Sequence, residues 1–298
     1  MHISIHNFIG HTANFYNKIE NYWQGDKNHR ILGNILVITF LGSLLLIYLK
    51  RSGFIGEPIA NYIPIKYFSA IVLAFMALLV FEVFSLIFIL PGSVSGSMLK
   101  QFEIFSLILL RDVFKSIETF PEPISWNHVT QAIYPMAFDA GGALLIFIGI
   151  YYIRKLQLHQ SITADSKKQN QFIEVKKILS LILIGVFLFL AGYDIMLFFQ
   201  HATTFKMFLL FYTVLIFFDI LMVLISLRYN LSYKVLFRNS AFAIATIILR
   251  LSLAASPYYK ALLGVASVVF VWVLTYFYSK YVRDQIKSKT KDLSGFRE

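Results

Sequence analysis

An all-α bundle of membrane-spanning helices is the fold class that the sequence predicts. Hydrophobic residues make up 58% of the 298 residues, and charged residues only 14%, against roughly 25% charged in a soluble domain. The apolar residues form runs long enough to cross a bilayer, which takes about 20 residues per helix. The net charge is +11, but the positive charges lie between these runs. A soluble enzyme, a disordered chain and a nucleic-acid-binding domain are therefore excluded.

Seven apolar runs are candidate spans, and together they make one transmembrane helical domain. The sixth run is the shortest and ends at Pro257, because proline cannot continue helical backbone bonding. The predicted spans are 31–49, 67–91, 131–153, 178–200, 207–227, 240–256 and 261–281. The predicted organisation is an extramembrane or interfacial segment 1–30, a transmembrane domain 31–281 and a basic cytoplasmic tail 282–298.

The stretch between the second and third spans has a different pattern. Residues 101–117 have a broad apolar face typical of a helix, but Glu103 and the adjacent Arg111 and Asp112 bracket only seven uncharged residues. That run is too short to span a bilayer. We therefore predict an extra external helix, either amphipathic on the membrane surface or re-entrant.

The distribution of Lys and Arg predicts the orientation. With seven spans, one set of loops holds 18 of these residues and the other set holds 8. Because cytoplasmic loops carry the excess of positive charge, the N-terminus is predicted outside and the C-terminus in the cytoplasm. The basic loops would face anionic lipids of the cytoplasmic leaflet. We expect an integral membrane protein of the bacterial inner (plasma) membrane.

Five ionisable residues fall within the predicted spans. Each costs about 2.5–3.5 kcal/mol if it is unpaired at the bilayer centre, and such residues usually face the bundle interior. They lie at similar depths below the predicted outer face, so they can converge on one polar cavity. Four carboxyls against one guanidinium leave a charge of −3, which requires protonation, bound cations or water. The candidate transport or ion-binding residues are Glu82, Asp139, Asp194, Asp219 and Arg250.

Two neighbouring features extend this hypothesis. In the sixth span, helical spacing places Asn239, Thr246 and Arg250 on one small and polar face, which is typical of a helix–helix interface. Polar residues of the external helix can form a vestibule to the cavity. The candidate vestibule residues are Glu103, Arg111 and Asp112.

The leading functional prediction is a channel or transporter that passes a small cation, H⁺ included, through a carboxylate-lined cavity. The alternative is a non-catalytic receptor, assembly factor or subunit of a larger membrane complex, with a second copy or another membrane protein as partner. Cysteine is absent, and so are the Walker and dinucleotide fingerprints. No nucleophile–base or metal-ligand set is visible, so we expect no enzymatic activity, catalytic residue, metal site or cofactor.

Overall fold

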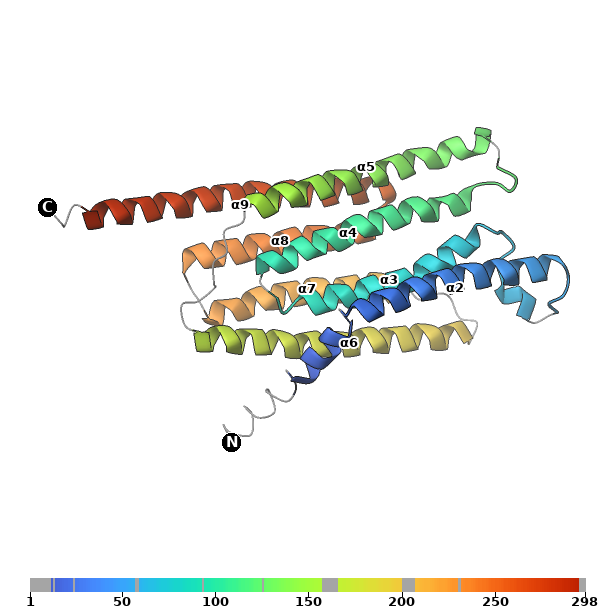
Figure 1. The fold of residues 1–298 in the computed structure, drawn as a ribbon, viewed down its shortest axis with the longest axis horizontal. Helices are drawn as coiled ribbons and strands as arrows, with labels where there is room; N and C mark the ends of the chain where they lie inside the picture. Colours follow the sequence, from blue (N-terminus) through green and yellow to red (C-terminus); the bar gives the residue numbers. More distant parts are fainter. Residues whose placement is uncertain are drawn as a thin grey trace.

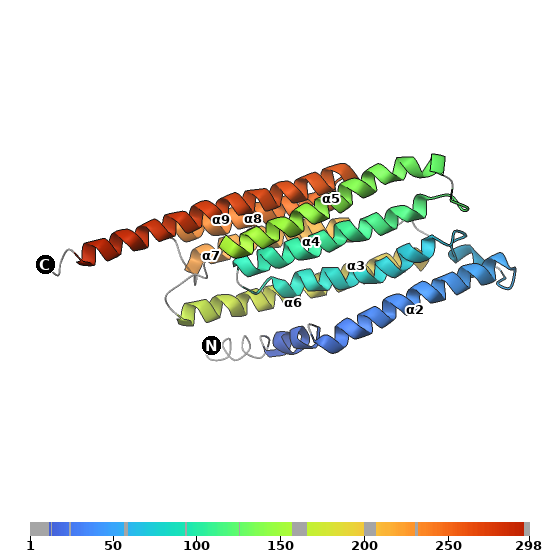
Figure 2. The ribbon, with the colours of Figure 1, turned by 45° about the horizontal axis from the view of Figure 1, so that its top comes forward.

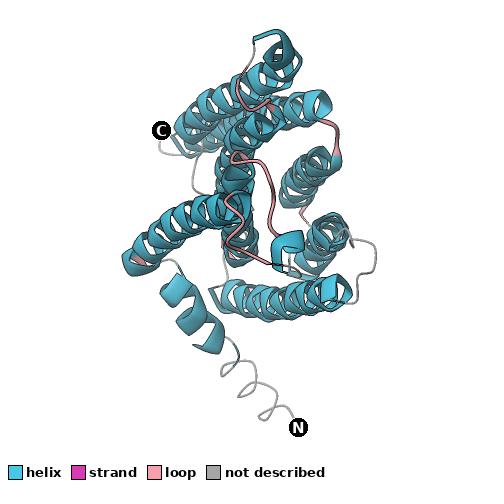
Figure 3. Cartoon of the chain, turned by 90° about the vertical axis from the view of Figure 1, so that its right-hand side faces the viewer, coloured by secondary structure: helices cyan, strands magenta, loops and turns pink. Residues whose placement is uncertain are grey.

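The chain folds into a bundle of long helices. The computed structural model describes residues 12, 14–23, 25–56, 59–92, 94–124, 126–156, 166–199, 207–229 and 232–294. All regular structure in these residues is helical (Figure 3). The predicted all-α fold class is therefore confirmed.

The long helices follow one another along the chain. Two single-turn helices, Ile59–Tyr62 and Ile117–Thr119, lie in the connections. The long helices are α2 (Asp26–Arg51), α3 (Ser69–Ile89), α4 (Val94–Ser116), α5 (Trp126–Leu156), α6 (Ser166–Phe199), α7 (Met207–Tyr229), α8 (Tyr233–Ala254) and α9 (Pro257–Ser294).

Seven of these helices are long and apolar enough to cross a membrane, as predicted. They are α2, α3 and α5 to α9, and each overlaps one predicted span. Proline marks two of their limits: Pro91 follows the end of α3, and Pro257 occupies the first position of α9, where its missing N–H costs nothing. The chain is an integral membrane protein by these features.

The position of α4 corrects one prediction. The extra helix near 101–117 exists, but it begins at Val94 and runs alongside α3 and α5 along the whole bundle (Figures 1 and 2). It also contacts α8 and α9, and buried side chains such as Phe102, Phe105 and Leu109 place it in the core. The external, surface or re-entrant placement is therefore wrong. Hydropathy did not indicate the core position of this helix because two of its charged residues, Arg111 and Asp112, are paired with Glu82 of α3 and Lys260 of α9.

An additional helix along the bundle also changes the placement of the termini. The helices α2 to α9 alternate in direction, so the start of α2 and the end of α9 lie at the same end (Figures 1 and 2). Direct contacts agree, because the Tyr16 hydroxyl donates to Phe88 O at 2.9 Å near the end of α3. Burial there raises the pKa of the Tyr16 phenol. The predicted opposite placement of the termini is wrong, since it assumed seven crossings.

The basic residues concentrate at the end where α9 finishes, which we call the basic end. Of the 27 Lys and Arg residues, 18 lie in the described helices toward this end and 6 lie toward the opposite end. Arg250 lies between them, and Lys206 and Arg297 fall outside the described residues. The charge asymmetry predicted from seven spans therefore persists with eight helices. Of the predicted basic tail 282–298, residues 282–294 continue α9, and 295–298 lie outside the described residues.

Glycines let α5 pack closely against α9. A Cβ added at Gly149 would lie 2.1 Å from Val268 Cγ1, and one added at Gly142 would lie 2.8 Å from the Ala261 Cβ. These separations are well below van der Waals contact. Gly141, on the same helix, has no such neighbour within 4 Å.

This packing predicts opposite effects for two glycine variants of α5. Gly149→Ala is expected to lower the free energy of unfolding by about 1–3 kcal/mol, because the stiff Val268 side chain must move. Gly141→Ala is the matched control, and it should leave stability unchanged or raise it by up to about 1 kcal/mol. Thermal denaturation midpoints in one detergent compare the two. Equal midpoints for both variants would contradict the close α5–α9 packing.

Candidate functional site

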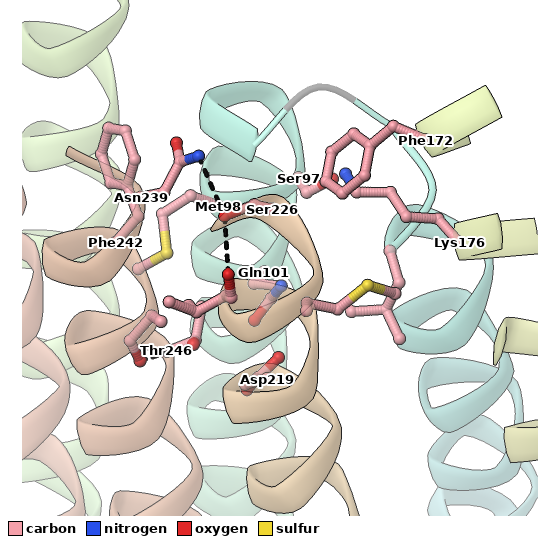
Figure 4. A pocket seen from close by; sticks show the side chains of 14 residues that line it. Ser97, Met98, Gln101, Phe172, Lys176, Asp219, Ser226, Asn239, Phe242 and Thr246 are labelled. Carbon is pink, nitrogen blue, oxygen red and sulfur yellow. Dashed lines mark hydrogen bonds between the residues drawn. The ribbon is translucent and has the colours of Figure 1, made fainter. Parts of the chain in front are cut away.

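A polar cavity lies between α4, α6, α7 and α8 toward the basic end of the bundle. Its volume is about 70 Å³, enough for about two waters at roughly 30 Å³ each. Lys176 and Phe172 enter it from α6, and Asn239 and Thr246 face it from α8 (Figure 4). Asp219 of α7 also lines it. The cavity confirms that the polar face predicted for the sixth span is turned inward.

Asp219 forms a buried ion pair with Arg250 beside this cavity. The Arg250 Nε donates to Asp219 Oδ2 at 3.4 Å, and its Nη2 donates to the Gln101 side-chain oxygen at 3.3 Å. Arg250 is only 1% exposed and Asp219 6%. Both hydrogen bonds are long, and Arg250 Nη1 has no partner within the described protein. The guanidinium is therefore shared between a carboxylate and a neutral amide.

A second group, which we call the ion-pair cluster, consists of Glu82, Arg111, Asp112 and Lys260. Arg111 of α4 bridges Glu82 Oε2 of α3 at 3.0 Å and its neighbour Asp112 Oδ1 at 3.1 Å. Lys260, near the start of α9, pairs with the other oxygen of Asp112. The ion-pair cluster therefore ties α3, α4 and α9 together with alternating charges.

The two groups of charges lie at different depths. Ten residues of α4 separate Gln101 from Arg111, which is about 15 Å along a helix. Tyr212 of α7 is buried, stands seven residues before Asp219 on the same helix, and lies within electrostatic range of Arg111, Glu82 and Arg250. Buried polar side chains therefore extend from the ion-pair cluster through Tyr212 and the Asp219–Arg250 pair to the cavity. We call this arrangement the polar seam.

The remaining predicted residues do not converge on the cavity. Asp139 of α5 is 2% exposed and lies in electrostatic range of Lys260 and Asp112, but its Oδ1 has no hydrogen-bond partner within the described protein. Asp194 of α6 is partly exposed and forms no ion pair among the described residues. Asp139 thus borders the ion-pair cluster, and Asp194 lies outside the polar seam.

The predicted vestibule is divided between the two ends of α4. Arg111 and Asp112 belong to the ion-pair cluster. Glu103 instead pairs with Lys100 at 2.8 Å and with Arg154, both more than half exposed, toward the basic end. An external vestibule made of Glu103, Arg111 and Asp112 is therefore wrong, because eight residues of helix separate the first from the other two.

The charge balance of the interior differs from the predicted −3. The ion-pair cluster, Asp139, the Asp219–Arg250 pair and the cavity together contain four carboxyls and four bases. Three of these bases, Arg111, Lys176 and Lys260, lie outside the predicted spans. Arg111 and Lys260 pair with carboxyls, whereas Lys176 forms no ion pair among the described residues. No group of metal-ligating side chains occurs in the described part of the chain.

Several residues of the polar seam were not predicted from the sequence. Gln101 and Tyr212 are uncharged, so a search for ionisable residues in apolar runs passes over them. Lys176 and Lys260 stand within two residues of a predicted span, where a basic residue is normally a membrane-surface anchor. Comparisons with known proteins add no further residues, since the chain matches no protein-family model, no curated protein and no solved structure.

Proposed function

We propose that this protein passes protons across a membrane through the polar seam, with Asp219 as the proton-exchanging group. The observation that supports this most is the sharing of Arg250 between Asp219 and Gln101 at the inner side of the cavity. When Asp219 takes up a proton, Arg250 keeps the neutral Gln101 as a partner, so neither state leaves the guanidinium without a hydrogen bond.

A proton fits this arrangement better than a metal cation does. A metal cation needs several oxygen ligands around it, and no group of three or more side chains that could hold one occurs in the described part of the chain. Protonating and deprotonating Asp219 changes the charge by one unit next to a fixed cation. Among the small cations that the sequence analysis allows, the proposal therefore selects H⁺. It assigns no chemical reaction to the protein.

Orientation and membrane are part of the same proposal. The basic end is assigned to the cytoplasm by the positive-inside rule, which places both the start of α2 and the end of α9 there. The membrane is proposed to be the bacterial inner (plasma) membrane, with anionic lipids against the basic end. The cavity then lies in the cytoplasmic half and the ion-pair cluster in the opposite half.

Proteoliposomes that contain a pH-sensitive dye test the proposal. With a membrane potential imposed, the lumen of liposomes that contain the wild-type protein is expected to acidify faster than the lumen of empty liposomes. Both rates are measured with and without small organic acids and amino acids outside. Asp219→Asn should reduce the rate by roughly a hundredfold or more, the scale on which a proton-transferring side chain contributes. Asp194→Asn is the matched control, because Asp194 lies outside the polar seam, and its rate should match the wild-type rate.

Two results would overturn proton passage. The first is a wild-type rate equal to that of empty liposomes under both conditions, which would leave the non-catalytic receptor, assembly factor or complex subunit as the better proposal. The second is an Asp219→Asn variant that elutes as a folded protein and retains the wild-type rate. The latter would remove Asp219 from the path.

A further inference from the structure

Lys176 is a buried lysine that lines the polar cavity. It takes no part in the proposed proton path. Lys176 is 4% exposed, yet none of the ion pairs in the described residues includes it. Its Nζ donates to Gly92 O at 2.9 Å and lies 4.8 Å from the centre of the Phe172 ring. An ammonium buried at this depth is costly without a counter-charge. The lysine therefore favours a negatively charged ligand in the cavity.

A second side chain on the facing helix points to the same cavity. Asn239 is 3% exposed, and its Oδ1 has no hydrogen-bond partner within the described protein. Its Nδ2 makes only a long contact, 3.5 Å, with the Ser226 hydroxyl. Figure 4 shows Asn239 on the side of the cavity across from Lys176. A buried acceptor without a donor costs free energy, so the ligand should also carry a hydrogen-bond donor.

Charge and size restrict the ligand further. Asp219 is compensated by Arg250, so Lys176 leaves the cavity one positive charge in excess, which a single negative charge neutralises. A zwitterion would bring a second positive charge without a free carboxylate to receive it. A volume of about 70 Å³ is about half of the roughly 150 Å³ of a cavity that binds benzene, so the site takes the polar end of a small ligand and nothing larger.

We propose that the cavity is a binding site for a small monovalent hydroxycarboxylate, with its carboxylate on Lys176 and its hydroxyl donating to Asn239 Oδ1. Gln101 and Ser97 of α4 line the cavity between these two groups. The inference goes beyond proton passage, because it assigns an organic ligand to the cytoplasmic half of the same polar seam.

Equilibrium binding of radiolabelled lactate to the purified full-length protein in detergent tests this site. Lactate is expected to bind and to raise the thermal denaturation midpoint. Propionate, which lacks the hydroxyl, should bind roughly tenfold more weakly, because Asn239 Oδ1 stays unpaired. Lys176→Gln should weaken lactate binding by roughly tenfold or more, because a charge-assisted hydrogen bond is lost. Lys177→Gln, on the next residue of α6, is the matched control and should bind as the wild type does.

A second variant separates binding from folding. Asn239→Leu should remove the preference for lactate over propionate while propionate still binds, so it remains informative if Lys176→Gln fails to fold. The proposal is overturned if wild-type protein binds no lactate, if Lys176→Gln binds it normally, or if alanine or inorganic phosphate binds more tightly. It is also overturned if phosphatidylglycerol nanodiscs abolish a binding seen in phosphatidylcholine nanodiscs, since a lipid headgroup would then be the occupant.

Lactate binding is measured without a membrane potential, so its result does not depend on proton passage. Each proposal can therefore be contradicted without the other. Lactate binding without proton flux would overturn proton passage alone. Proton flux without lactate binding would overturn the ligand site alone.

Discussion

Replacing Arg250 with Met is expected to lower the free energy of unfolding by about 3–5 kcal/mol, because the variant leaves the Asp219 carboxylate buried without its partner. Arg250 is 1% exposed and Asp219 6%, so neither protein nor solvent can readily replace the lost ion pair. Reversible unfolding in mixed detergent micelles, followed by circular dichroism, measures the change. The expected loss is a large part of the whole stability of a domain.

The double variant Arg250→Met/Asp219→Leu tests the cause of that loss. Replacing a buried ion pair by apolar residues of similar size is often close to neutral, so the double variant should lie within about 1 kcal/mol of the wild type. Lys100→Met serves as the control, since its pair with Glu103 is more than half exposed on the lysine side and contributes under about 1 kcal/mol. A double variant as unstable as Arg250→Met would show that packing, rather than the unpaired charge, causes the loss.

Replacing Arg111 with Met is expected to have a comparable effect, again about 3–5 kcal/mol, because Glu82 loses its ion-pair partner. The Glu82 side chain is 4% exposed, and its Oε1 already has no hydrogen-bond partner within the described protein. Adding Glu82→Gln to Arg111→Met should recover part of the loss, since a neutral amide is less costly to bury than a carboxylate. The same unfolding measurement compares the single and double variants.

The fourth member of the ion-pair cluster provides a matched comparison. Lys260→Met should cost less than Arg111→Met, because Asp112 keeps Arg111 as a partner and Lys260 is itself partly exposed. Combining Lys260→Met with Arg111→Met should cost more than the sum of the two, since Asp112 then loses both partners. An additive result would contradict a shared role of the two bases at Asp112.

The apolar helices could be predicted from the sequence because hydropathy and length report directly on burial in lipid. All seven predicted spans correspond to helices. The core position of α4 could not be predicted in this way, because its charges are compensated by residues distant in the sequence, such as Glu82 and Lys260. The side of the N-terminus was predicted wrongly for the same reason. When α4 is left out as a crossing, the connections that precede it are assigned to the wrong side of the membrane.

The candidate site was partly predictable. Glu82, Asp139, Asp219 and Arg250 are buried as expected of intramembrane charges. Their grouping depends on which helices contact each other, and hydropathy, helical spacing and charge counts do not show that. The predicted acidic excess arose because Lys176 and Lys260 stand just outside apolar runs, yet their side chains turn into the bundle. Gln101, the second partner of Arg250, is neutral and gives no signal in a count of charges.

The composition of α4 has a consequence for how the protein enters a membrane. Lys100, Glu103, Arg111, Asp112 and Lys115 lie within its 23 residues, and each charge near the bilayer centre opposes partitioning by about 2.5–3.5 kcal/mol. This helix therefore cannot leave the translocon for lipid by itself. Two of its charges, Arg111 and Asp112, are paired with Glu82 of α3 and Lys260 of α9, so α4 is expected to enter the bilayer together with these helices. Since α5 to α8 lie between α4 and α9 along the chain, the charges of α4 are fully paired only after α9 has been synthesised.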